Sequence, residues 1–171
     1  MAMGAGQGLK GLAALLLFLN LCMYIILAAI GGWAIQVAID QGFIIGPGLE
    51  LPAHFTAIFF PMGNAATGFF VVFAIIAAVV GAASAIAGLH HIRAWNTESL
   101  PAAASAGVIA WTLTLLAMGL AWKEIVLGGR NAKLRTMEAF SIILSATQLV
   151  YVLVIHAAPP IMFHAGQPAR R

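Results

Sequence analysis

The chain has 171 residues, of which 63% are hydrophobic and only 8% are charged. A soluble domain carries roughly 25% charged residues, so this composition excludes an ordinary water-soluble fold. The net charge of +3 is too small for a nucleic-acid-binding surface, and it favours contact with anionic lipid head groups. We therefore expect a protein whose partner is the lipid bilayer, with no nucleic acid bound.

Four long stretches contain no Asp, Glu, Lys or Arg, and each exceeds the ~20 apolar residues with which a helix crosses a bilayer. The charged residues that enclose these stretches are Lys10 and Asp40, Glu50 and Arg93, Glu98 and Lys123, and Glu138 and Arg170. The pattern predicts membrane spans at 12–37, 65–89, 101–122 and 139–157. The expected fold is all-α: a single integral membrane domain over residues 1–171, a four-span transmembrane helical bundle with a long apolar first loop.

Each predicted span carries one face of small or polar residues at helical spacing. In chain order these faces are Asn20, Tyr24, Leu27 and Gly31; Ala74, Ala77, Ala78, Gly81, Ser84, Ala85 and Gly88; Ala103, Ala106, Gly107, Ala110, Thr114, Ala117 and Ala121; and Glu138, Ser141, Ser145, Gln148 and Tyr151. Small residues let helix backbones approach closely in lipid. The four faces therefore predict a compact bundle.

Two amide side chains, Asn20 and Gln148, belong to these faces. Amides between membrane helices form interhelical hydrogen bonds, typically of ~0.6–2 kcal/mol, so packing is the favoured interpretation. A polar pathway through the bundle is the alternative.

The connection between Asp40 and Asn64 is apolar and is broken by three prolines. We expect it to cover the mouth of the bundle or to lie in the membrane interface. The stretch from Lys123 to Glu138 is interpreted as a basic loop facing lipid head groups, with Glu124 paired to Lys123 and Glu138 to Arg135. This interpretation leaves no charge inside any span, which argues against ion-coupled transport.

No catalytic motif is present, and the scattered carboxylates form no acid-base pair, so we expect no enzyme activity and no cofactor. The histidines lack metal-ligand spacing, so no metal site is predicted. The positive-inside rule does not decide the orientation, because Lys and Arg are equally frequent on the two sides. Lys10 before the first span, with Asp40 and Glu50 after it, favours both tails inside the cell.

Several long strings carry a resemblance to a known family: MAMGAGQGLKGLAALLLFLNLCMYIILAAIGGWAI at the start, LPAHF and FFPMGNAATGFF around the first loop, and GLHHIRAW at 88–95. They resemble the abscisic-acid-induced plasma-membrane polypeptide family of plants, the wheat-type 19-kDa membrane proteins. The resemblance implies a multi-pass plasma-membrane protein associated with seed maturation and with desiccation or freezing stress. It also implies a role in abscisic acid uptake.

Two functions are therefore weighed. The first is uncoupled facilitation of abscisic acid uptake, with the hormone's apolar ring and carboxylate held by aromatic, polar and basic groups. The candidate ligand-binding residues are His54, Phe55, Phe59, Phe60, Asn64, Thr67 and Arg93. Four helices offer little room for the repeated halves of secondary carriers, so a pathway could require a homo-oligomer. The alternative is a protein that stabilises the membrane or scaffolds other proteins, with no transported ligand.

Overall fold

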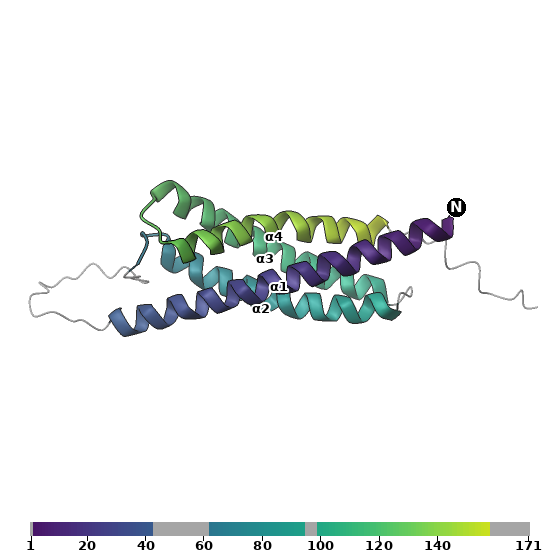
Figure 1. Cartoon of the computed structure of the whole chain (residues 1–171), viewed down its shortest axis with the longest axis horizontal. Coiled ribbons are helices and arrows are strands. Elements are labelled where there is room, and N and C mark those ends of the chain that lie inside the picture. The colour runs from purple at the N-terminus through teal and green to yellow at the C-terminus, as the bar shows by residue number, and fades with distance from the viewer. Residues whose placement is uncertain (1, 43–61, 95–98, 158–171) are drawn as a thin grey trace, which may run out of the picture.

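The computed structural model describes residues 2–42, 62–94 and 99–157 (Figure 1). Four helices make up this part of the chain: α1 (Ala2–Gly42), α2 (Thr67–Ala94), α3 (Ser99–Leu127) and α4 (Ala132–Ala157). All four are long and apolar enough to cross a membrane, and the described residues include no strand. The predicted all-α, four-span fold is confirmed.

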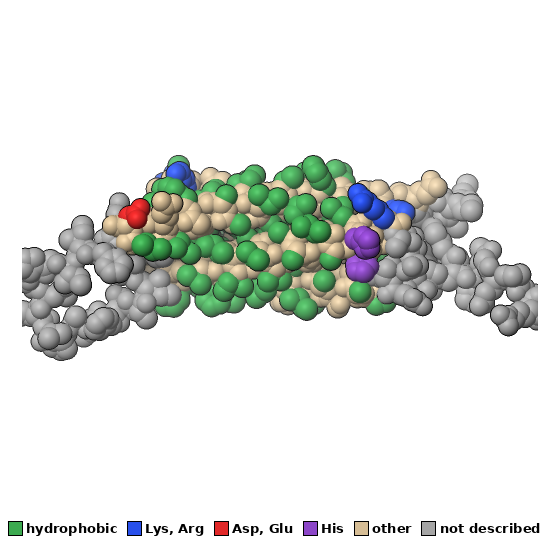
Figure 2. Space-filling model, turned by 90° about the horizontal axis from the view of Figure 1, so that it is seen from below, with side chains coloured by type: hydrophobic (Ala, Val, Ile, Leu, Met, Phe, Trp, Pro, Cys, Tyr) green, Lys and Arg blue, Asp and Glu red, His purple; other side chains and the backbone are tan. Residues whose placement is uncertain are grey.

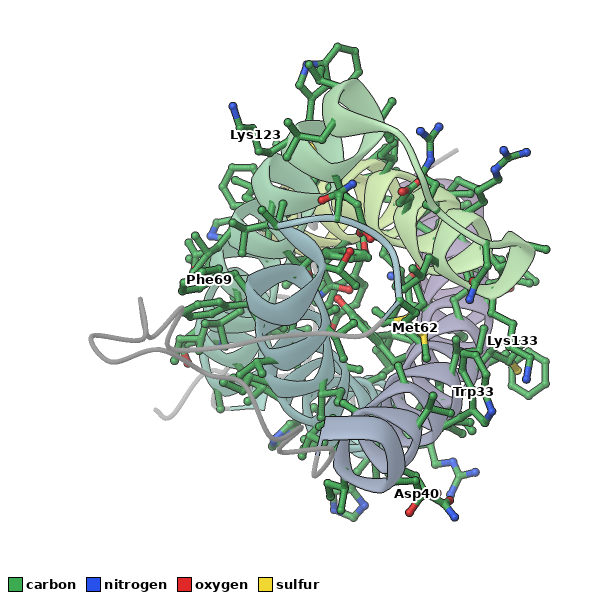
Figure 3. All side chains as sticks on the ribbon, turned by 90° about the vertical axis from the view of Figure 1, so that its left-hand side faces the viewer. Trp33, Asp40, Met62, Phe69, Lys123 and Lys133 are labelled. Carbon is green, nitrogen blue, oxygen red and sulfur yellow. The ribbon has the colours of Figure 1, made fainter. Side chains whose placement is uncertain are left out.

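The helices form a ring in which neighbours along the chain are neighbours in space and run in opposite directions (Figure 1). α1 closes the ring by packing against α4 as well as against α2. At the end where α4 begins, the Lys133 Nζ atom lies 3.5 Å from the centroid of a Trp33 ring on α1 (Figure 3). This cation–π contact joins the first and last helices.

The outer surface of the bundle is apolar. Figure 2 shows hydrophobic side chains over the middle of one face, with charged and histidine side chains towards the two ends. Large side chains such as Phe18, Ile86 and Leu153 are more than half exposed. In water such a surface would aggregate, whereas in a bilayer it meets lipid tails, so the packing agrees with membrane insertion.

All four helices extend beyond at least one end of the predicted spans. The hydrophobic pattern marks only the segment inside the hydrocarbon, whereas the backbone hydrogen bonds of a helix continue into the interface. The difference changes the interpretation at the α3–α4 connection, where the predicted basic loop from Lys123 to Glu138 is wrong. Only residues 128–131 lie outside the helices there.

Local chemistry explains this short turn. Gly128 and Gly129 adopt positive φ angles of 72° and 76°, and residues that carry a Cβ rarely adopt this backbone conformation. The Asn131 Oδ1 atom accepts a hydrogen bond from the Leu134 N–H at 2.9 Å, as an N-cap residue does, and so begins α4 at Ala132.

The predicted small and polar faces pack inside the ring, with every member buried except the half-buried Ala106. Gly31 of α1 lies against the Ile75 side chain of α2, where a Cβ would have no room. The apolar core comprises one cluster around Tyr24, Phe70 and Leu144 and a second around Leu17 and Tyr151. Helical periodicity thus identified the faces by which the helices meet.

Candidate functional site

Polar side chains of all four helices face the interior of the bundle rather than the lipid. The buried ones are Asn20, Thr67, Ser84, Thr114, Glu124, Glu138, Ser141, Ser145 and Gln148. Figure 3 shows side-chain oxygen atoms in the space that the four helices enclose. Polar groups within a membrane are costly unless they find partners, so their partners indicate what each group does.

The two amides singled out in the sequence lie together. The Asn20 Nδ2 atom donates to Gln148 Oε1 at 2.8 Å, and the Thr147 hydroxyl donates to Asn20 Oδ1 at 2.6 Å. The Gln148 Nε2 atom donates to the Gly107 carbonyl at 3.3 Å. This network joins α1, α3 and α4, and the two amides satisfy each other rather than lining an open pathway.

Two tyrosines cross the interior between helices that are not neighbours in the ring. The Tyr24 hydroxyl on α1 lies 2.9 Å from the Thr114 hydroxyl on α3, and its ring occupies the space left by Gly81. Tyr151 of α4 places its hydroxyl against Gly88 of α2. The small residues of α2 therefore make room for aromatic rings as well as for neighbouring backbones.

At the loop end of the bundle, Asn64 and Thr67 tie the start of α2 to the end of α3. The Asn64 Nδ2 atom donates to the carbonyls of Glu124 at 3.0 Å and Gly128 at 2.7 Å. The Thr67 hydroxyl donates to Glu124 Oε1 at 2.7 Å. Both residues were candidate hydrogen-bond donors to a ligand, and their side-chain donors are engaged by the protein itself.

The carboxylates have other partners than the predicted ones. Glu138 Oε2 pairs with Arg130 Nε at 2.8 Å, and the Arg130 Nη1 atom also donates to the Ile125 carbonyl at 2.9 Å. Lys123 is exposed, whereas the adjacent Glu124 is buried, because successive residues of a helix point in different directions. The turn at residues 128–131 brings Arg130 to Glu138 in place of the predicted Arg135.

Two carboxylates are buried where α3 and α4 extend beyond the predicted spans 101–122 and 139–157. Glu124 and Glu138 have 0% and 3% of their surface exposed, so the bundle interior shields them although they lie outside those spans. One oxygen of each, Glu124 Oε2 and Glu138 Oε1, is buried without a hydrogen-bond partner. The sequence contained one indication that Glu138 is buried, because Glu138 is the first residue of the polar face that continues through Ser141, Ser145 and Gln148.

A groove of about 620 Å³ lies at the opposite end of the bundle, between the start of α1 and the end of α2. Its lining combines basic and amide groups with apolar ones: Gln7, Lys10, Gly11, Ala14, Leu89, Ile92 and Arg93. Arg93 lies in the last turn of α2 and Thr67 begins this helix, so the structure separates these two candidate ligand residues by the length of a span. The candidates His54, Phe55, Phe59 and Phe60 lie outside the described residues.

Comparison with known proteins agrees with this architecture. The AWPM-19-like family matches residues 18–158, which include α2, α3, α4 and most of α1. The chain belongs to this family. A relative, Membrane protein PM19L of rice (Oryza sativa subsp. japonica), is 47% identical over 153 residues, which cover 89% of this chain and 80% of the relative. No solved structure matches the chain. Membership in the AWPM-19-like family confirms the resemblance found in the sequence, and this chain is a multi-helix membrane protein.

Proposed function

We propose that this protein resides in the plasma membrane and facilitates the uptake of abscisic acid into cells during seed maturation and desiccation or freezing stress. The observation that supports the proposal is the groove between α1 and α2, in which Lys10 and Arg93 lie beside apolar side chains. Abscisic acid is an amphipathic weak acid, with an apolar ring and a carboxylate. The groove offers a surface for each part.

The chemistry of recognition follows from the lining residues. A guanidinium such as that of Arg93 forms two parallel hydrogen bonds with a carboxylate, and Lys10 adds a second positive charge. Ala14, Leu89 and Ile92 provide an apolar wall for the ring. The volume of about 620 Å³ falls within the ~300–1,000 Å³ range of small-molecule sites. The proposed role is to bind abscisic acid and let it pass through the bilayer without catalysis. Assembly as a homo-oligomer is compatible with this role.

Flux of labelled abscisic acid into proteoliposomes tests this proposal. Arg93→Gln and Lys10→Gln should each lower uptake about tenfold or more at low hormone concentration, because each removes a charge-assisted contact of ~1.5–3 kcal/mol. Lys123→Gln is the matched control, since it removes an exposed cation at the other end of the bundle. Wild-type rates equal to those of empty liposomes refute the proposal.

A second function is stabilisation or scaffolding of the membrane in stress tolerance. The tight contacts between the helices favour it. Gly31, Gly81 and Gly88 each hold a side chain of another helix against the backbone, and the Asn20–Gln148 hydrogen bond closes the centre. Such packing needs no ligand. Vesicles containing the protein should then leak less than bare vesicles after drying and rehydration, and equal leakage removes this alternative.

A further inference from the structure

The charges at the loop end of the bundle do not balance. Two carboxylates, Glu124 and Glu138, are buried, and Arg130 connects their surroundings: it forms the ion pair with Glu138 and donates to the carbonyl of Ile125, the residue after Glu124. The other basic side chains of this end, Lys123, Lys133 and Arg135, are exposed. Lys133 lies over Trp33, and Arg135 acts on Glu138 electrostatically without forming an ion pair with it. With both carboxylates ionised, the buried group would hold one negative charge more than its guanidinium compensates.

The hydrogen bonds of this group are also incomplete. Among the described residues, the two carboxyl groups accept hydrogen bonds only from the Thr67 hydroxyl of α2 and from Arg130. The second oxygen of each carboxyl group is shielded from solvent and has no partner. The large majority of buried side-chain polar atoms in proteins are hydrogen-bonded, so two buried carboxyl oxygens without a partner point to a positive or hydrogen-bonding species that binds them.

We propose that Glu124 and Glu138 together bind one exchangeable monovalent cation, most simply a proton taken from the aqueous phase at the loop end of the bundle. The added charge balances the pair against Arg130. A proton on Glu124 Oε2 or Glu138 Oε1 turns that oxygen into a hydrogen-bond donor, whereas an alkali cation is coordinated by both oxygens. An ionisable group facing the interior of a membrane bundle is typical of ion and proton pathways.

The site suggests a link to transport, and this step rests on the proposed function. Abscisic acid crosses as an anion or as a neutral acid, and a cation carried by the same bundle would offset the charge of the anion. Uptake would then depend on the cation gradient, in contrast with the uncoupled passage expected from sequence. The groove at Lys10 and Arg93 and the carboxyl pair lie at opposite ends of the bundle.

Thermal unfolding of the full chain in nanodiscs tests the site directly. A cation bound only by the folded state stabilises that state, and above the dissociation constant the gain grows with the logarithm of the cation concentration. The melting temperature should therefore rise by about 3–5 °C for each tenfold increase in the concentration of the bound cation, either as pH falls or as Na⁺ replaces choline at constant ionic strength. The first result identifies a proton and the second an alkali cation.

Variants of the same shape without the charge test whether Glu124 and Glu138 cause the dependence of the melting temperature on the cation. Glu124→Gln and Glu138→Gln should abolish this dependence, whereas Asp40→Asn, an exposed carboxylate on α1, should retain it. The comparison among variants removes any dependence that all of them share. A wild-type dependence on pH and Na⁺ that equals that of both Gln variants overturns the proposal. If liposomes take up no abscisic acid, the proposed function fails while the melting experiment still decides the cation site.

Discussion

At the scale of single residues, the interior of this bundle is held by specific polar contacts as well as by apolar packing. Helices in lipid gain little from burying apolar groups, because lipid tails are as apolar as leucine. Hydrogen bonds such as those from Asn20 to Gln148 and between Tyr24 and Thr114 therefore fix which helices meet and in what register. These contacts connect residues that are far apart in the chain.

The Asn20–Gln148 pair provides a quantitative test. Asn20→Leu should lower the free energy of unfolding by about 1–3 kcal/mol, because it leaves the buried Gln148 Oε1 atom without its Asn20 donor. The double variant Asn20→Leu with Gln148→Leu should lose less than the sum of the single changes, as measured by denaturation in detergent. Gln36→Leu, an exposed amide on α1, serves as the control. Strict additivity would show that the pair contributes no coupling.

At the scale of the helices, the small residues of α2 receive side chains from both α1 and α4. Its small face receives the Tyr24 ring at Gly81 and the Tyr151 hydroxyl at Gly88, while Ile75 fits against Gly31 of α1. These close approaches need the absence of a Cβ, so the glycines are required by packing rather than by backbone conformation. The small face of α2, which the sequence predicted to contact other helices, thus also accommodates the side chains of Tyr24 and Tyr151.

Gly81→Leu should displace the Tyr24 ring and destabilise the bundle by roughly 1–3 kcal/mol, the usual effect of overpacking a core. Gly119→Ala on α3 is the matched control, because a Cβ there meets no atom within 4 Å and alanine favours the helix. Retention of the monodisperse peak during heating, followed by size-exclusion chromatography, measures the difference. Equal stability of the two variants would contradict the packing at Gly81.

At the scale of the whole molecule, four antiparallel spans place the beginning of α1 and the end of α2 on one side of the membrane and the α3–α4 turn on the other. The two ends also differ in chemistry. One end has the groove with Lys10 and Arg93, and the other has the buried carboxylates with Arg130. Any path through the bundle would join these two environments.

The sidedness can be measured with single cysteines in a Cys22→Ser background. An impermeant thiol reagent should label Lys123→Cys on intact cells, and it should label Gly8→Cys only after permeabilisation. This follows from the antiparallel ring together with the expectation that both tails lie inside. Labelling of both positions from the same side would contradict the four-span topology, and reversed labelling would contradict the orientation alone.

The sequence by itself determined that this is a membrane bundle, because charge-free stretches of span length have few other physical explanations. It also determined the inward faces. The 3.6-residue period of a helix places Asn20, Gly81, Thr114 and Gln148 each on the small or polar face of its own helix, whichever helices lie beside it. Asn20 and Gln148 could be named together because two amides in lipid need partners.

Only the tertiary structure decided the partners and the ends of the helices. Because the Asn131 cap and the turn at Gly128 and Gly129 are short, most of the basic segment is helical and belongs to α3 and α4. Glu124 and Glu138 are therefore buried, whereas the sequence indicated an interfacial loop. Whether a charge at the end of a span meets water or protein depends on which helix lies beside it. Hydrophobic periodicity records which way a side chain points along its own helix, and it contains no information about the residue that faces it.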